Sequence, residues 1–309
     1  MDPTPATGSP TNIECTIESM IVFRDLIGLL SKLFEFAALT FEFDQSKNAG
    51  KIIIMEMNPN KTVLAKVIVR LDQIKFSPES KTKCVKHVNL KEFHLELSKL
   101  SKTNADDESP SDLPLQILTK SSNFKLIVKS IGLNNEREIP LYDKPHYELP
   151  LPTVTFRYKV SITCDDFCRT LDYFDRAAKE NIQQVEISVS LNQITFRAKQ
   201  YTNTLVENGQ RPIQPIDPIT NKYELEHFLK LYPVHKITDS IDIFVKEDFH
   251  LCLLIRTPIS TMFMFISPLA ETEHSDSEHS ETENPNEETS ETENPDDETP
   301  LTEDPDIAN

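Results

Sequence analysis

The chain has 309 residues, enough for two domains, and its hydrophobic fraction of 38% suffices for ordinary packed cores. The formal net charge of −18 is unevenly placed: residues 270–309 carry 16 acidic and no basic residues, so the rest of the chain is close to neutral. The five cysteines are widely spaced without a Cys-x-x-Cys pair, which argues against a disulfide framework and favours a reducing compartment.

The first part of the chain predicts a strand, a helix, several strands, a second helix and three strands. After a lead at 1–12 that we expect to be disordered, the strand at 13–19 precedes a helix at 20–34 whose polar strip is Arg24, Gly28, Ser31 and Lys32. Strand patterns follow at 35–44, 50–57 and 61–71. An amphipathic helix is expected at 88–102, and the last three strands at 113–120, 123–130 and 136–142.

A proline-studded segment, "DKPHYELPLPTV", then crosses the middle of the chain. Its prolines keep residues 143–153 extended, where a polar flexible linker would be usual. Leu149 and Leu151 alternate with prolines, so we expect both side chains to point the same way.

The second part repeats the order of elements. A strand at 154–162 leads into a helix at 164–180, strands at 185–191 and 194–200, and a Pro-rich loop at 201–219. A short helix at 222–232 is expected to stop at Pro233, before strands at 240–247, 250–256 and 261–267. The repetition predicts an α+β fold of two similar domains, 13–142 and 154–269, with helices on one face of antiparallel sheets. The tail at 270–309 is an acidic low-complexity repeat, "SETENPNEET" then "SETENPDDET", which we expect to be disordered.

The motifs of common enzyme classes are absent from the sequence. There is no Gly-rich phosphate loop, no G-x-S-x-G, no H-E-x-x-H and no Cys/His zinc spacing. We therefore expect no catalytic residues, no metal and no cofactor, and a binding protein in place of an enzyme. The start of the sequence lacks the features of a signal peptide and no stretch reaches 18 uninterrupted apolar residues, so we expect an intracellular protein without a membrane span.

Basic residues recur at helical spacing on the predicted helices. One interpretation is a phosphate-facing surface that binds DNA without reading its sequence, and the alternative is an ordinary solvated face. The candidate DNA-binding residues are Arg24, Lys32, Lys91, Lys102, Arg169, Arg176, Lys179, Lys230 and Lys236.

The ordered set of elements resembles the sliding clamp family of the proliferating cell nuclear antigen (PCNA) type over residues 14–269. "EIPLYDKPHYELPLPTVTFRYKVSI" is similar to that family's interdomain connector and the strand after it. "CDDFCRTLDYFDRA" and "VNLKEFHLELSKLSK" resemble two of its helices, and "TMFMFISPL" resembles its final strand. The resemblance implies two clamp-type domains, each with two inner helices packed on antiparallel sheets, and three chains closing a ring around duplex DNA.

The resemblance also implies a pocket beneath the connector for hydrophobic peptides of partner proteins. The matching residues here are Met57, Leu149, Leu151, Pro152, Phe265, Ser267 and Pro268. For Met57 and Phe265 taken singly, core packing is the alternative. The implied function is a DNA polymerase processivity factor for replication or repair, located in the nucleus or at a viral replication site, whose partners are double-stranded DNA, a polymerase, other clamp-binding proteins and a clamp loader.

Two features depart from the family pattern. Asp25, Glu92, Glu96 and Asp172 lie on or near the inner helices, and the Pro-rich loop at 201–219 falls where the family pairs an edge strand with the neighbouring subunit. A homotrimer is therefore one of three open assemblies, beside a subunit of a heteromeric checkpoint-type clamp and a viral processivity factor that forms no ring.

Overall fold

The computed structural model describes residues 13–44, 49–76, 83–101, 112–119, 125–131, 135–145, 149, 154–207 and 217–270. These residues belong to one compact unit, and the predicted lead and the tail from 271 onward lie outside them. No helix of the described residues is long and apolar enough to cross a membrane.

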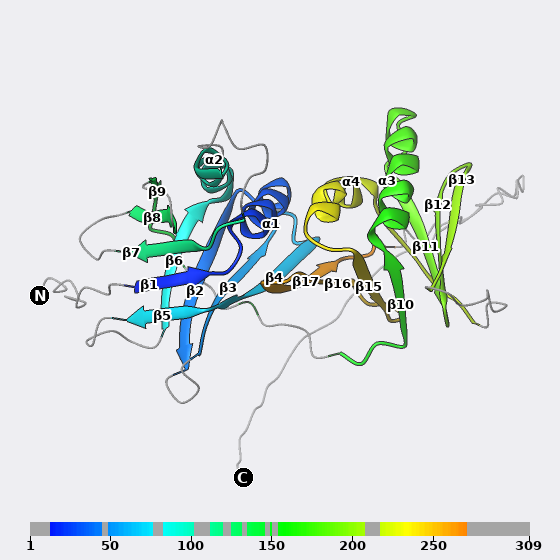
Figure 1. The fold of residues 1–309 in the computed structure, drawn as a ribbon. Coiled ribbons are helices and arrows are strands. Elements are labelled where there is room, and N and C mark those ends of the chain that lie inside the picture. The colour runs from blue at the N-terminus through cyan, green and yellow to red at the C-terminus, as the bar shows by residue number, and fades with distance from the viewer. Residues whose placement is uncertain are drawn as a thin grey trace, which may run out of the picture. The chain divides into compact units, whose positions relative to one another are not determined.

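The elements come in the repeated order that the sequence predicts (Figure 1). The first half contains β1 (Ile13–Ile17), α1 (Met20–Leu33), β2 (Phe36–Asp44), β3 (Ala49–Met57), β4 (Val63–Leu71), β5 (Gln73–Phe76), β6 (Lys83–Asn89), α2 (Leu90–Ser101), β7 (Leu115–Thr119), β8 (Lys125–Ser130) and β9 (Glu136–Pro140). The second half contains β10 (Tyr158–Thr163), α3 (Cys164–Lys179), β11 (Gln184–Ser190), β12 (Gln193–Ala198), β13 (Tyr201–Val206), β14 (Ile219–Glu224), α4 (Leu225–Leu229), the 3-10 helix η1 (Tyr232–Lys236), β15 (Ser240–Val245), β16 (Leu251–Arg256) and β17 (Ser260–Ile266).

The strands form three antiparallel sheets. The first sheet has the order β5-β1-β7-β8-β9, and the third has the order β13-β12-β11-β14. The second, an eight-stranded sheet of order β10-β15-β16-β17-β4-β3-β2-β6, takes four strands from each half. The two halves join where β17 pairs with β4, from Ser260 opposite Val69 to Ile266 opposite Val63. The α+β fold class is confirmed, whereas the exact domain boundaries at 142 and 154 stay a prediction.

Side-chain caps fix where the long helices begin. The Ser19 hydroxyl accepts a hydrogen bond from the amide of Val22 (3.1 Å), and the Thr163 hydroxyl accepts one from the amide of Asp166 (3.1 Å). Asn89 Oδ1 accepts from two amides of the first turn of α2. Such caps satisfy amides that have no partner within the helix, so these three predicted helices form with starts close to the expected ones.

The predicted polar strip of α1 is only partly polar surface. Gly28 and Ser31 are buried, and the Ser31 hydroxyl donates to the Gly28 carbonyl at 2.8 Å. A Cβ on Gly28 would lie 2.8 Å from Nε2 of His94, so the missing side chain lets α2 approach α1 closely. The expected strip was therefore wrong at these two positions, because the second helix covers them.

The structure corrects the expectations for 201–232. Residues 201–206 form β13, the edge strand of the third sheet, where a Pro-rich loop was expected. Residues 219–224 form β14, although a helix was expected from 222 onward, and α4 is only five residues long. The register decides both, because β13 and β14 pair with β12 and β11 through ladders that no local apolar pattern announces.

The sequence also missed two strands of the first half. β5 pairs with β1, and β6 pairs with β2, from Phe36 opposite Asn89 to Glu42 opposite Lys83. β6 reads Lys-Cys-Val-Lys-His-Val-Asn, in which single apolar residues alternate imperfectly with cations. In the second half, β10 begins at Tyr158, four residues after the expected start.

Candidate functional sites

The helices form one continuous layer through both halves of the unit. α1 packs against α2 and against η1, and both η1 and α4 pack against α3. Figure 1 shows α1, α2 and α4 on the same side of the strands of the eight-stranded sheet. We call the outward positions of 20–33, 90–101, 164–179 and 225–236 the helix surface.

All the predicted DNA-binding cations belong to these elements except Lys102, which lies outside the described residues. Four of the others are paired with neighbouring carboxylates. The ion pairs are Arg24–Asp25 (2.9 Å), Arg169–Asp166 (3.2 Å), Lys179–Asp175 (2.6 Å) and Lys230–Glu226 (2.8 Å). Surface pairs of this kind contribute little to stability, but they lower the positive potential that a phosphate would meet.

The remaining four cations have no carboxylate partner among the described residues. Lys32, Lys91 and Lys236 are exposed, and the guanidinium of Arg176 lies 5.8 Å from the ring centroid of Tyr173. Lys32 lies in the last turn of α1 and Lys236 ends η1, two elements that pack together. Among the described residues, these two lysines therefore bring positive charge without a carboxylate partner to the junction of the two halves.

His94 marks the same junction from α2. Burial lowers the pKa of His94, and the positive charges of Arg24, Lys32 and Lys236 lower it further, against the opposing effect of Asp25. Besides burial, the three cations disfavour the charged form of the imidazole, which indicates a locally positive environment. The positive potential of the helix surface is therefore highest between α1, α2 and η1, while α3 carries four acidic residues against three basic ones.

On the opposite face of the eight-stranded sheet, a row of apolar residues runs across several strands. Residues directly opposite one another on paired strands share a face. The register places Met57 opposite Leu64, Leu64 opposite Phe265, and Phe265 opposite Cys252. We call this face the outer face, because the alternate residues of β3, Ile52 and Ile54, are buried in the core.

The connector begins with residues fixed to the first half. The Tyr142 amide donates to the carbonyl of His87 (2.9 Å), and its hydroxyl donates to Oε2 of Glu92 (2.9 Å), a bond that raises the pKa of Tyr142. The Tyr142 ring meets Phe36 edge to face, with centroids 5.1 Å apart. Lys144 Nζ then lies 3.1 Å from the Phe36 ring centroid, a cation–π contact. These contacts fix residues 142 and 144 to the first half.

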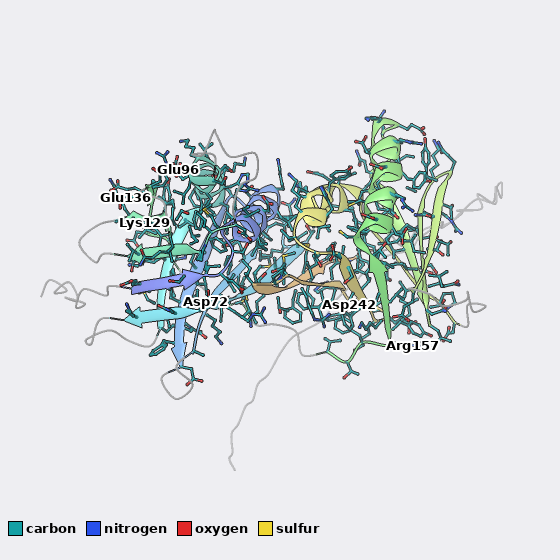
Figure 2. The ribbon with its side chains drawn as sticks, in the orientation of Figure 1. Asp72, Glu96, Lys129, Glu136, Arg157 and Asp242 are labelled. Atoms are coloured by element: carbon teal, nitrogen blue, oxygen red, sulfur yellow. The ribbon has the colours of Figure 1, made fainter. Side chains whose placement is uncertain are left out.

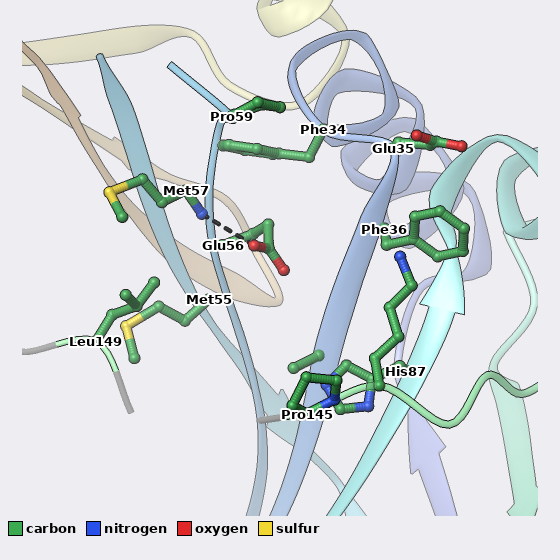
Figure 3. Close-up of a pocket in the computed structure, with 12 residues that line it drawn as sticks. Phe34, Glu35, Phe36, Met55, Glu56, Met57, Pro59, His87, Pro145 and Leu149 are labelled. Atoms are coloured by element: carbon green, nitrogen blue, oxygen red, sulfur yellow. Dashed lines mark hydrogen bonds between the residues drawn. The ribbon is translucent and has the colours of Figure 1, made fainter. Parts of the chain in front are cut away.

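A pocket of about 390 Å³ opens between the connector and the end of β3 (Figure 3). The residues that line it are Phe34, Glu35, Phe36, Ala38, Met55, Glu56, Met57, Pro59, His87, Lys144, Pro145 and Leu149. Leu149 also borders a second hollow of about 180 Å³ with Ile53, Met55 and Lys66. Concave, largely apolar surfaces with a few polar groups are typical of ligand sites, and methionine adapts well to varied apolar guests.

The structure brings together part of the predicted pocket. Met57 and Leu149 line the same cavity. Phe265 lies in the same row of apolar residues as Met57, although its side chain is only 6% exposed. The amide of Ser267 donates to the carbonyl of Thr62 (2.8 Å), which places the exit of β17, including the half-buried Pro268, beside the turn after β3. Leu151 and Pro152 lie outside the described residues.

Sequence reasoning missed the other wall of this pocket. Phe34, Glu35 and Phe36 come from the end of α1 and the start of β2, and Lys144 from the connector. No local motif marks them, because they meet only through the sheet register. The sequence offered one indication of this wall, which is that Phe36 lies near the start of the strand predicted at 35–44, where its large apolar side chain has to pack against another surface.

No reactive chemistry gathers among the described residues. They hold no group of three His, Cys, Asp or Glu side chains close enough for a metal ion. All five cysteines lie in the described ranges and are free, and burial raises the pKa values of Cys15, Cys164 and Cys252 to about 12. A thiol with so high a pKa is a poor nucleophile at neutral pH, so these residues serve packing.

The described fold is that of a sliding clamp of the PCNA type. The chain superposes on proliferating cellular nuclear antigen from Entamoeba histolytica with a TM-score of 0.66 and 11% identity, over 84% of this chain and 99% of that one. It superposes on the PCNA2–PCNA3 complex of Sulfolobus tokodaii with a TM-score of 0.65 and 14% identity, over 84% of this chain and all of that one.

Sequence comparison finds relatives that agree with this fold. The chain is 27% identical over 245 residues to a probable DNA polymerase sliding clamp of Acanthamoeba polyphaga mimivirus, over 73% of this chain and 49% of that protein. It is 26% identical over 267 residues to a second, uncharacterized mimivirus protein, over 84% of this chain and 79% of that protein. No protein-family model matches the sequence. The match thus spans about half the length of the mimivirus clamp, and the predicted resemblance to the sliding clamp family of the PCNA type is confirmed.

Proposed function

We propose that this chain is a DNA sliding clamp, a processivity factor without catalytic activity that tethers a DNA polymerase and other proteins to duplex DNA. The observation that carries the proposal is the placement of two surfaces on opposite sides of one sheet. The helix surface lies on one side, and the largely apolar pocket, lined in part by Lys144, Pro145 and Leu149 of the connector, opens on the other. A molecule so built holds DNA with one face and a partner protein with the other.

The helix surface suits contacts that do not depend on base sequence. Lys32, Lys91, Arg176 and Lys236 offer exposed positive charge on long, flexible side chains. Such side chains attract phosphates and exchange them readily, because each contact is weak and screened by salt. The low net charge of the surface favours sliding over tight binding.

The pocket suits an apolar peptide from a partner. Met55, Met57 and Leu149 supply adaptable apolar walls, and Lys144 and Pro145 of the connector line the same pocket. Peptides that bind in such grooves gain affinity from a few buried apolar anchors. The mimivirus relative described as a probable DNA polymerase sliding clamp supports a polymerase as one such partner.

A closed ring needs an edge strand at each end of the subunit. β9 ends the first sheet and β13 ends the third, and β13 contains no proline. This supports a ring of three copies joined through these edges, acting in the nucleus or at a viral replication site. Native mass measurement of the purified chain tests the assembly: three copies support a homotrimer, whereas a monomer that assembles only with other chains supports a heteromeric clamp.

The test of function is primer extension on a singly primed circular template. The reaction uses a replicative DNA polymerase from the organism that encodes this chain. We expect longer products with the clamp present, and loss of this gain when Leu149→Ala is combined with Leu151→Ala. Unchanged product lengths with the wild-type chain would refute the processivity function. Full stimulation by the double variant, with an unchanged unfolding transition, would refute the pocket.

A further inference from the structure

Glu56 is a carboxylate without a cationic partner in an otherwise largely apolar pocket. It lies at the end of β3 between Met55 and Met57, and it is half-buried. Its Oε1 accepts a hydrogen bond from the Met57 amide at 3.2 Å. Among the described residues no basic side chain comes within ion-pairing distance of it, and burial raises the pKa of this carboxyl. A half-buried carboxylate that accepts few hydrogen bonds favours a ligand that supplies a further hydrogen-bond donor.

Lys144, whose charge acts on Glu56, makes its contact with an aromatic ring. The Lys144 ammonium lies 3.1 Å from the Phe36 ring centroid, and it acts on Glu56 only through its field, which lowers the pKa of the carboxyl against the larger effect of burial. A second carboxylate, that of the exposed Glu35, stands at the rim of the same pocket. Figure 3 shows both acids toward the end of the pocket away from Leu149. This end therefore carries two negative charges against one positive charge.

The charges at this end of the pocket limit the class of ligand that it can bind. An anionic guest would meet two carboxylates, and a metal ion would lack a third ligand among the described residues. A wholly apolar guest would remove water from Glu56 and give no hydrogen bond in return, which costs free energy. A guanidinium satisfies the carboxylate with a bidentate, charge-assisted pair of hydrogen bonds.

We propose that this end of the pocket binds an arginine that flanks the apolar anchors of a partner peptide, with Glu56 as the specificity-determining residue. The proposal rests on the peptide-docking function proposed above. Lys144 competes with the guest arginine, because the positive charge of each interacts with the Glu56 carboxylate. Removal of Glu56 and removal of Lys144 therefore change the preference for arginine in opposite directions.

The probe is a displayed library of random 12-residue peptides, selected on the full wild-type chain. One enriched peptide is then synthesised with its flanking arginine and with alanine in that place, and both affinities are measured by fluorescence anisotropy. For the wild-type chain we expect the arginine peptide to bind about tenfold more tightly, the effect of one charge-assisted hydrogen-bonded pair.

The matched variants separate the contributions. Glu56→Gln keeps the shape of the side chain and should reduce the ratio of the two affinities to near one, while Lys144→Ala should increase it. Glu96→Gln, which removes one carboxylate from α2 outside the pocket, should leave the ratio unchanged. Met57→Ala should weaken both peptides alike.

The outcomes distinguish the two proposals. If peptides bind through the pocket but the ratio is the same for wild type and Glu56→Gln, the role of Glu56 is refuted and the docking function stands. If the library yields no peptide whose binding is weakened by Met57→Ala, the docking function is refuted and the arginine proposal falls with it.

Discussion

Replacement of Lys32 and Lys236 by alanine should lower the salt dependence of DNA binding. These lysines end α1 and η1 at the junction of the two halves, and both are exposed without a carboxylate partner among the described residues. If each contacts one phosphate, each contact releases condensed counterions from the DNA when it forms. The double variant Lys32→Ala/Lys236→Ala removes both contacts and leaves no unpaired acid behind.

The magnitude follows from counterion release. Each phosphate contact contributes about 0.9 to the negative slope of log affinity against log salt concentration. Loss of two contacts should therefore make the slope shallower by about 1.8 for each subunit that touches the DNA. Between roughly 50 and 200 mM salt, the affinity of the double variant should fall about tenfold less than that of the wild-type chain.

The assay is fluorescence anisotropy of a labelled duplex across that range of salt, repeated on a second duplex of unrelated sequence. The control is Lys61→Ala/Lys246→Ala, which removes the same charge from two exposed positions outside the helix surface, in the turn between β3 and β4 and directly after β15. An unchanged slope in the test variant would refute the placement of DNA on the helix surface. An equal change in the control would show that net charge alone governs binding.

Four further predictions concern stability, titration and the tail. Gly50→Ala should lower the free energy of unfolding by about 1–3 kcal/mol in a urea titration, because a Cβ there would lie 2.5 Å from Cγ2 of Ile74; an unchanged midpoint would contradict this close approach of β3 and β5. Burial lowers the pKa of His227, whose Nε2 lies 2.9 Å from Thr62 Oγ1, so the unfolded chain binds its proton at higher pH than the folded chain. Stability should therefore fall as the pH drops below about 6.5, less steeply in His227→Gln, and equal slopes by thermal unfolding would assign the loss to other groups. The raised pKa values of Cys15, Cys164 and Cys252 predict that these three thiols react slowly with Ellman's reagent at pH 8 in the native chain and fast in denaturant. Rapid native labelling of these three cysteines would contradict their burial. Deletion of 271–309, which removes 16 acidic residues, should raise the affinity for duplex DNA at low salt, and an unchanged affinity would leave the tail a solubilising segment.

The comparison with the sequence prediction is clearest at the helices. Met20–Leu33, Leu90–Ser101 and Cys164–Lys179 carry apolar residues at helical spacing and begin at Ser, Asn and Thr caps. Periodicity and caps are local properties, so the sequence alone predicts them well. The same holds for the repeated order of elements. The extended conformation of the connector stays a prediction.

The strands at 201–206 and 219–224 show where local reasoning fails. Tyr201–Val206 has little apolar alternation, yet it pairs with β12 along its whole length, and Ile219–Glu224 pairs with β11 although a helix follows directly. Backbone partners far along the chain decide these elements. The correction matters for function, because it restores an edge strand where the sequence suggested a loop.

The sequence by itself determined the fold class, the family resemblance and the residues Met57 and Leu149 as members of one site. Only the tertiary structure decided what surrounds them. The pairing of β2 with β3 and the cation–π contact of Lys144 with Phe36 bring Phe34, Glu35 and Glu56 to the same pocket. Likewise, only packing separates the four cations that neighbouring acids neutralise from the four that have no carboxylate partner among the described residues. A side chain's partners depend on contacts between distant segments, and one sequence without its register does not specify them.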